Sequence, residues 1–138
     1  MIMEIKINCF QHLGIPVTDL ERSAAFYKGL GFENVMASDF VMNGEKGVMA
    51  MMQRGDMIIE IYQLPASLLG EIKTRKDGHI DHIAFDVDDV DTVFETLKSN
   101  GYQVIEPAPV FLPFWQKGCK YFNITGPGGE RLEFNQIL

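Results

Sequence analysis

The chain contains little cysteine, a minority of basic residues and no long apolar run. Only Cys9 and Cys119 are present among 138 residues, so no disulfide framework and no CxxC motif is expected. No segment approaches the roughly 20 apolar residues of a membrane span, and the N-terminus lacks the zones of a signal peptide. Acidic residues outnumber basic ones by 19 to 12, which disfavours a nucleic-acid-binding surface. We therefore expect a cytoplasmic protein that binds neither nucleic acid nor membrane.

The composition is that of one globular domain. Apolar residues make up 46% of the chain and charged residues 22%, which is sufficient for a buried core. We expect residues 1–138 to form a single domain. Apolar periodicity and the turn signals Asn43-Gly44 and Arg54-Gly55-Asp56 predict one strand, one helix and three further strands in the first half. Their predicted ranges are 9–17, 19–31, 32–42, 47–53 and 56–63.

The second half repeats this order of elements. A strand at 80–86 and a helix at 90–100 are followed by predicted strands near 102–106, 118–124 and 130–137. Shifting the sequence by 70 residues aligns His12 with His82, Asp19 with Asp89 and Gly31 with Gly101. A shift of 73 aligns Glu60 with Glu133. An internal repeat changes the fold expected, so we predict an α+β fold of two βαβββ modules, at 8–63 and 79–138, joined by a linker at 64–78.

Two histidines and two glutamates occupy equivalent positions of this repeat. Strand side chains alternate between faces, so Glu60 and Glu133 each lie on the face opposite their apolar neighbours. A carboxylate within an apolar strand costs several kcal/mol to desolvate unless it is paired or binds a metal. The symmetry of the repeat would bring the first and last strands of both copies together. The sequence therefore predicts one divalent ion, Ni²⁺, Zn²⁺, Co²⁺ or Mn²⁺, held by His12, Glu60, His82 and Glu133.

Each of these residues also has a simpler interpretation. A single strand histidine is more often a hydrogen-bonded core or surface residue. A single strand glutamate is more often exposed or paired with a basic side chain, and Arg131 is the obvious partner for Glu133. The metal-site hypothesis depends on histidine matching histidine and glutamate matching glutamate within one duplication.

Three phrases of the sequence resemble the vicinal oxygen chelate superfamily of glyoxalase I, bleomycin-resistance proteins and extradiol dioxygenases. They are His12-Leu-Gly-Ile-Pro-Val-Thr-Asp-Leu-Glu-Arg-Ser-Ala-Ala-Phe-Tyr, His82-Ile-Ala-Phe-Asp-Val-Asp-Asp-Val and Gly126-Pro-Gly-Gly-Glu-Arg-Leu-Glu133-Phe. The resemblance covers nearly the whole chain. It implies curved mixed sheets around a metal cleft, a small-molecule substrate and a homodimer.

Within that superfamily the ligand pattern His-Glu-His-Glu resembles bacterial glyoxalase I, a lactoylglutathione lyase. The resemblance implies that Glu133 is the catalytic base that takes a proton from the carbon of a thiohemiacetal, with Glu60 at the mirror-related position. Methylmalonyl-CoA epimerases of the same fold typically have glutamine where this chain has Glu60. An epimerase and a non-catalytic drug-binding or resistance protein remain the alternative functions.

One position departs from the glyoxalase I pattern. Pro16 stands where bacterial glyoxalase I commonly has an arginine that binds a carboxylate of glutathione, which argues against glutathione as the thiol. Arg75, Lys76, Lys117 or Lys120 could supply the anion contact instead, and each could equally be a solvated surface residue. An apolar segment broken by prolines contributes Phe111, Phe114 and Trp115. We predict that these three and Lys120 contact the substrate, with core packing as the alternative for the aromatic rings.

Overall fold

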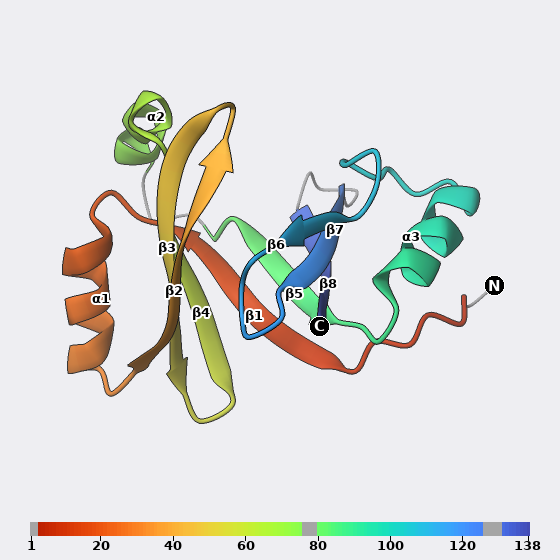
Figure 1. Cartoon of the computed structure of the whole chain (residues 1–138), viewed down its shortest axis with the longest axis horizontal. Coiled ribbons are helices and arrows are strands. Elements are labelled where there is room, and N and C mark those ends of the chain that lie inside the picture. Colours follow the sequence, from red (N-terminus) through yellow and green to blue (C-terminus); the bar gives the residue numbers. More distant parts are fainter. Residues whose placement is uncertain (1–2, 76–79, 126–130) are drawn as a thin grey trace. The chain divides into compact units, whose positions relative to one another are not determined.

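The computed structural model describes residues 3–75, 80–125 and 131–138. The chain forms two compact units (Figure 1). His12–Asp81 make the N-terminal unit, and Met1–Gln11 with His82–Leu138 make the C-terminal unit. Each unit combines a four-stranded mixed sheet with an α-helix, so the predicted α+β class is confirmed. The segment before His12 therefore groups with the second half, for example through the Asn8 amide, which donates to Asp86 O at 2.9 Å.

The N-terminal unit follows the predicted order of elements. The chain runs through β1 (Cys9–Pro16), α1 (Leu20–Gly29), β2 (Glu33–Met42), β3 (Glu45–Arg54) and β4 (Met57–Gln63). The strand order is β2-β3-β4-β1, with β1 parallel to β4 and the other neighbours antiparallel. Two short helices follow within the expected linker, η1 (Ala66–Leu68) and α2 (Leu69–Thr74).

The C-terminal unit repeats this arrangement. Its elements are β5 (His82–Asp86), α3 (Val90–Ser99), β6 (Val110–Leu112), β7 (Cys119–Thr125) and β8 (Arg131–Ile137). The strand order is β5-β8-β7-β6, with β5 parallel to β8. Residues 126–130 of the closing motif lie outside the described residues. None of the helices within the described ranges is long and apolar enough to span a bilayer.

Both long helices begin with the same pair of contacts. Asp19 and Asp89 are the N-cap residues, and each accepts a hydrogen bond at 3.0 Å from the backbone three residues ahead. Hydrogen bonds from Thr92 lower the pKa of Asp89. Gln63 and Gln136 accept the first helical N–H of α1 and α3, at 2.9 and 3.0 Å. The glutamine that recurs after each strand glutamate therefore joins the last strand of its module to the start of its helix.

The two hairpins of the N-terminal unit use the turns that their sequences predict. Asn43 and Gly44 have φ values of 52° and 76° between β2 and β3. Two consecutive positive φ angles define a type I′ turn, which matches the twist of the strands that it joins. Gly55 has a φ of 58° between β3 and β4, again at a predicted turn.

Each helix packs on one face of the sheet of its own unit. In the N-terminal unit Ala50, Met52 and Ile61 are buried against side chains of α1, including Leu20, Ala24 and Tyr27. In the C-terminal unit the buried side chains of α3 pack on Phe122, Ile124 and Phe134. Residues next to these in each strand point to the opposite face. Glu60 and Glu133 consequently lie on the faces that the helices leave uncovered.

One strand prediction for the second half was wrong. Residues 102–106 form only an isolated bridge, between Val104 and Ile124, and the edge strand β6 lies further along. At the break, the carboxylate of Glu106 accepts hydrogen bonds from the backbone N and from Nδ2 of Asn123, at 2.6 and 2.7 Å. A glutamate side chain thus replaces a strand carbonyl. The following prolines are tolerated because an edge strand uses only one row of backbone donors.

Each edge strand places a phenylalanine ring over a glycine, Gly47 within β3 in one unit and Gly118 just before β7 in the other. A Cβ added to Gly47 would lie 2.3 Å from Phe40 Cζ, and one added to Gly118 would lie 2.3 Å from Phe111 Cε2. A shift of 71 residues relates both members of the two pairs. An aromatic ring over an edge glycine covers the gap that the absent side chain leaves. The duplication therefore extends to the packing of the sheet edges.

Replacing Gly118 with alanine is expected to lower the free energy of unfolding by about 2–3 kcal/mol. Gly118 has a φ of 91°, and its added Cβ would meet both the ring of Phe111 and the backbone oxygen of Leu112, at 2.9 Å. The control is Gly29→Ala, because a Cβ on Gly29 meets nothing within 4 Å and alanine favours the helix. Urea denaturation of both variants is the measurement. Equal stability of Gly118→Ala and the wild type would contradict this account of the sheet edge.

Candidate metal centre

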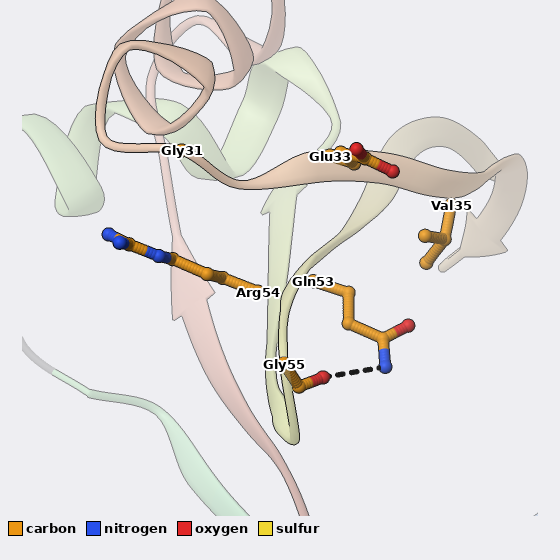
Figure 2. A pocket seen from close by; sticks show the side chains of 6 residues that line it. All are labelled: Gly31, Glu33, Val35, Gln53, Arg54 and Gly55. Carbon is orange, nitrogen blue, oxygen red and sulfur yellow. Dashed lines mark hydrogen bonds between the residues drawn. The ribbon is translucent and has the colours of Figure 1, made fainter.

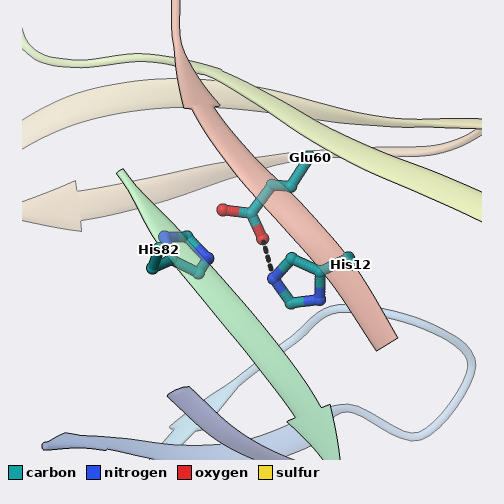
Figure 3. Close-up of side chains that lie close together, drawn as sticks. All are labelled: His12, Glu60 and His82. Carbon is teal, nitrogen blue, oxygen red and sulfur yellow. Dashed lines mark ion pairs between the residues drawn. The ribbon is translucent and has the colours of Figure 1, made fainter. Parts of the chain in front are cut away.

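The first histidine–glutamate pair lies on neighbouring strands of the N-terminal unit. The register sets Gly14 beside Glu60, and His12 precedes Gly14 by two residues on the same face. His12 Nε2 lies 3.5 Å from Glu60 Oε2 (Figure 3). The side chain of His12 is 1% exposed and that of Glu60 is 14% exposed. The residue paired with Glu60 on β1, Gly14, has no side chain.

The second pair lies at the equivalent place in the C-terminal unit. The register sets Ala84 beside Glu133, and His82 precedes Ala84 by two residues. His82 Nε2 lies 3.2 Å from Glu133 Oε2, and both side chains are at least nine-tenths buried. A small residue again stands beside the carboxylate. The two units therefore have the same His–Glu arrangement on equivalent pairs of parallel strands, β1 with β4 and β5 with β8.

The separations within the pairs fit donors that share a metal ion. Two donors bound at about 2.1 Å lie about 3.0 Å apart at a right angle and about 3.4 Å apart at the tetrahedral angle. The distances of 3.5 and 3.2 Å are close to these values, and 3.5 Å is long for a hydrogen bond. Imidazole nitrogen and carboxylate oxygen both suit a borderline divalent ion. The distance between the two donor atoms and their chemical type therefore allow each pair to supply two ligands to a divalent ion.

Glu133 is also held by residues that the sequence did not reveal. Asn135 Nδ2 donates to Glu133 Oε1 at 2.8 Å, and the side chain of Asn135 lies on the same face two residues further along β8. Gln11 Nε2 approaches Asn135 Oδ1 at 3.3 Å and Asp86 Oδ1 at 3.0 Å. Gln11 and Asn135 are buried. The signal in the sequence is that polar Glu133 and Asn135 stand at alternate positions of one strand, on either side of apolar Phe134.

Asn123 is a second buried polar residue on the same face. The register pairs it directly with Glu133 on the adjacent strand. Its Nδ2 is bound by Glu106, whereas no group in the described residues lies within hydrogen-bond distance of its buried Oδ1. The helix-free face of this sheet is therefore polar around Glu133.

The predicted substrate contacts lie in different surroundings. Phe114 is buried, Trp115 is half-buried, and Phe111 is exposed over Gly118. Trp115 has a φ of 66°, which is unusual for a bulky side chain. Lys120 pairs with Asp91 of α3, and alternation along β7 puts it on the helix-covered face, away from that of Glu133.

The alternative anion contacts are partly engaged elsewhere. Arg75 Nε donates to Glu71 Oε1 at 2.8 Å, and this hydrogen bond raises the pKa of Arg75. Lys76 lies outside the described residues. Lys117 is exposed, and its ammonium group forms no ion pair with a carboxylate of the described residues. An anion would therefore meet less competition from neighbouring carboxylates at Lys117 than at Arg75.

A surface pocket in the N-terminal unit involves none of the predicted site residues. Figure 2 shows it at the end of β3, where Gln53 Nε2 donates to Gly55 O at 3.0 Å. Arg54 Nη1 donates to Leu30 O at 2.7 Å, so its guanidinium caps the end of α1. Gln53 and Arg54, two polar residues of this pocket, are therefore engaged in hydrogen bonds that stabilise the surrounding fold. The lining residues are Gly31, Glu33, Val35, Gln53, Arg54 and Gly55.

Comparison with known proteins identifies the family. Residues 10–134 match the profile of the Glyoxalase/Bleomycin resistance protein/Dioxygenase superfamily, and the chain belongs to it. The expected superfamily is therefore confirmed. Members of this superfamily include enzymes, which leaves the particular reaction to be argued from the site. A search of curated proteins found no significant match.

Solved structures similar to this chain share its fold at low sequence identity. A hypothetical protein from Bacillus halodurans C-125 superposes with a TM-score of 0.75 at 24% identity, covering 96% of each chain. A methylmalonyl-CoA epimerase from Mycobacterium tuberculosis gives 0.77 at 19% identity, covering 100% of this chain and 93% of the other. A variant Streptomyces coelicolor methylmalonyl-CoA epimerase with 2-nitronate-propionyl-CoA gives 0.74 at 22% identity, covering 95% of each.

Proposed function

We propose that this chain is a metal-dependent enzyme that transfers a proton at a carbon atom next to a carbonyl group, in the manner of an epimerase. The substrate class is a small acyl thioester, such as the coenzyme A esters named for the similar epimerase structures. This choice replaces the lyase that the sequence favoured, because methylmalonyl-CoA epimerases are among the similar structures. Glyoxalase I activity becomes the second candidate.

The observation that carries the proposal is the buried His–Glu pair that occurs once in each unit. A buried carboxylate such as Glu133, or a half-buried one such as Glu60, is costly to maintain unless it has a function or a cation. Their partners on the parallel strands, Gly14 and Ala84, are small, and α1 and α3 pack on the opposite faces of the sheets. The proposal joins the two pairs, His12 with Glu60 and His82 with Glu133, as ligands of one divalent ion, Ni²⁺, Zn²⁺, Co²⁺ or Mn²⁺.

The carboxylates carry the proton-transfer steps. Glu133 takes the proton from the substrate carbon, so the C–H bond breaks and its electron pair moves toward the carbonyl. In this chain Glu60 would be the second proton-transfer group in place of the glutamine typical of epimerases: released from the ion and protonated, it would return a proton to the same carbon and invert its configuration. A bound divalent ion supplies a Lewis acid that stabilises the negative charge on the carbonyl oxygen. The histidines would bind the ion. Burial of the site keeps water from competing as the proton donor.

A carboxylate at position 60 favours the second candidate. Epimerases of this fold typically carry glutamine there, by the superfamily resemblance, and the four-ligand set resembles that of glyoxalase I. In that reaction one base moves a proton between adjacent carbons of a thiohemiacetal to give a 2-hydroxythioester. The thiol would be one other than glutathione, since Pro16 occupies the position of the expected arginine.

One pair of assays separates the two candidates. Metal-loaded protein is incubated in deuterium oxide with a single epimer of methylmalonyl-CoA, and separately with methylglyoxal and a panel of thiols. An epimerase incorporates deuterium at the carbon between the carbonyls and inverts it. A thiohemiacetal isomerase instead forms a 2-hydroxythioester. Absence of both products with every metal would contradict the proposal and favour a binding protein.

We also propose that the protein acts as a homodimer. The dimer is what the superfamily resemblance implies. Sedimentation of the purified protein measures the oligomeric state directly.

A further inference from the structure

A chain of hydrogen bonds leads from the N-terminal segment to the Glu133 carboxylate. Asp86 Oδ1 accepts from Gln11 Nε2 at 3.0 Å, and Gln11 Nε2 also approaches Asn135 Oδ1 at 3.3 Å. Asn135 Nδ2 donates to Glu133 Oε1 at 2.8 Å. All four residues belong to the C-terminal unit.

The two carboxylates at the ends of this chain determine how both amides are oriented. An ionised carboxylate accepts hydrogen bonds and donates none. The Asp86 carboxylate can therefore bind only the NH₂ group of Gln11, which fixes the orientation of the Gln11 amide. The same NH₂ group requires an acceptor from Asn135, so the Asn135 amide turns its oxygen toward Gln11. The NH₂ group of Asn135 is then left to face Glu133. Reversing Asn135 would place its oxygen against the Glu133 carboxylate and two NH₂ groups against each other.

Further contacts fix the same two amides. Gln11 Nε2 also lies 3.3 Å from the backbone oxygen of Asn135. Asn135 Nδ2 lies 3.9 Å from Cys119 Sγ. Asn8 Nδ2 donates to the second oxygen of Asp86 at 2.9 Å. Because Gln11 and Asn135 are only 7% and 4% exposed, water has little access to compete for these hydrogen bonds.

We infer that Asn135, held by Gln11 and Asp86, is the positioning residue that aligns the Glu133 carboxylate for proton transfer. Oε1 is bound by the amide, and Oε2 faces His82 at 3.2 Å. A base whose orientation is already fixed loses less rate to misalignment. The inference rests on the proposed function, and it names Glu133 rather than Glu60 as the carboxylate that is aligned in this way.

The residue equivalent to Asn135 in the N-terminal module is not an asparagine. A shift of 73 residues aligns Asn135 with Tyr62 and Glu133 with Glu60. Tyr62 carries no amide, so the same contact cannot be built from the equivalent position of the N-terminal module. The two glutamates are thus chemically different despite their matched strands.

The test uses Asn135→Leu, which keeps the approximate volume and removes the hydrogen bond. We expect kcat to fall by about 10- to 100-fold, the range for losing a hydrogen bond to a charged group. KM and the Co²⁺ dissociation constant of the metal-free protein should stay within about threefold, because Asn135 is neither a ligand nor a substrate contact. Asn34→Leu, an exposed asparagine on β2, is the matched control.

Two further measurements keep the test decisive. Gln11→Leu leaves Asn135 in place and should lower kcat by a smaller factor. This variant provides the test if Asn135→Leu does not fold. The ¹⁵N and ¹H NMR signals of the Asn135 side-chain amide should shift in Glu133→Gln, independently of any activity. Unchanged amide signals, or an unchanged kcat in Asn135→Leu, would overturn the inference alone. A parallel loss of kcat and Co²⁺ affinity would also overturn it, whereas an inactive wild type would contradict the proposed function itself.

Discussion

Replacing Glu133 with glutamine is expected to lower kcat by about 1,000-fold, because a positioned general base contributes about 10²- to 10⁴-fold. Glutamine has nearly the same shape and can still accept a hydrogen bond from Asn135 through its carbonyl oxygen, so the fold should persist. It cannot take a proton from carbon at neutral pH. Steady-state kinetics of the metal-loaded variant, with its circular dichroism spectrum as a check of folding, is the measurement.

Two companion variants make this result specific. Glu95→Gln removes an exposed carboxylate from α3 and should leave kcat unchanged. Glu60→Gln tests the second proton-transfer group of the epimerase reaction, because loss of inversion would assign that group to Glu60 and retained inversion would place it on another residue. Full turnover in Glu133→Gln would show that another residue is the base.

Removing the metal with a chelator is expected to abolish turnover and lower the melting temperature. An ion present at a hundred times its dissociation constant stabilises the folded state by about 2.7 kcal/mol. For a chain of this length that corresponds to a shift of about 10 °C. Without the ion, the Glu60 and Glu133 carboxylates also lose a compensating positive charge. Calorimetry and activity before and after chelation are the measurements.

The identity of the restoring ion provides the control. Ni²⁺, Zn²⁺, Co²⁺ or Mn²⁺ should restore both properties, whereas Ca²⁺ should restore neither because it prefers six to eight oxygen ligands. Undiminished turnover and an unchanged melting temperature in protein freed of bound metal would contradict a metal-dependent mechanism.

Most of the fold could be predicted because the same sequence pattern occurs in both halves of the chain. Asp19 and Asp89 begin helices at matched positions, and Asn43-Gly44 has the residues that a type I′ turn requires. A single His or Glu in a strand says little, but equivalents in both halves made the pairs His12–Glu60 and His82–Glu133 predictable. The distances within those pairs were not part of the prediction.

The remaining features depend on contacts between residues far apart in the sequence. Residues 102–106 have the composition of a strand, yet Glu106 takes over hydrogen bonds of Asn123 and ends the pairing there. Gln11 and Asn135 are 124 residues apart, and nothing local marks them as partners. Lys120 looks available for a substrate anion until Asp91 of α3 is seen beside it. Such pairings follow from strand register, which local propensity does not specify.

The number of metal ions bound per chain tests the central claim most directly. Wild-type protein, His12→Ala and His82→Ala are each saturated with Zn²⁺ or Ni²⁺, freed of excess ion and analysed for metal and protein. If the two His–Glu pairs share one ion, the wild type holds one per chain and each variant holds far less. Two ions in the wild type and one in each variant would show two separate sites, and no bound ion in the wild type would contradict the metal centre altogether.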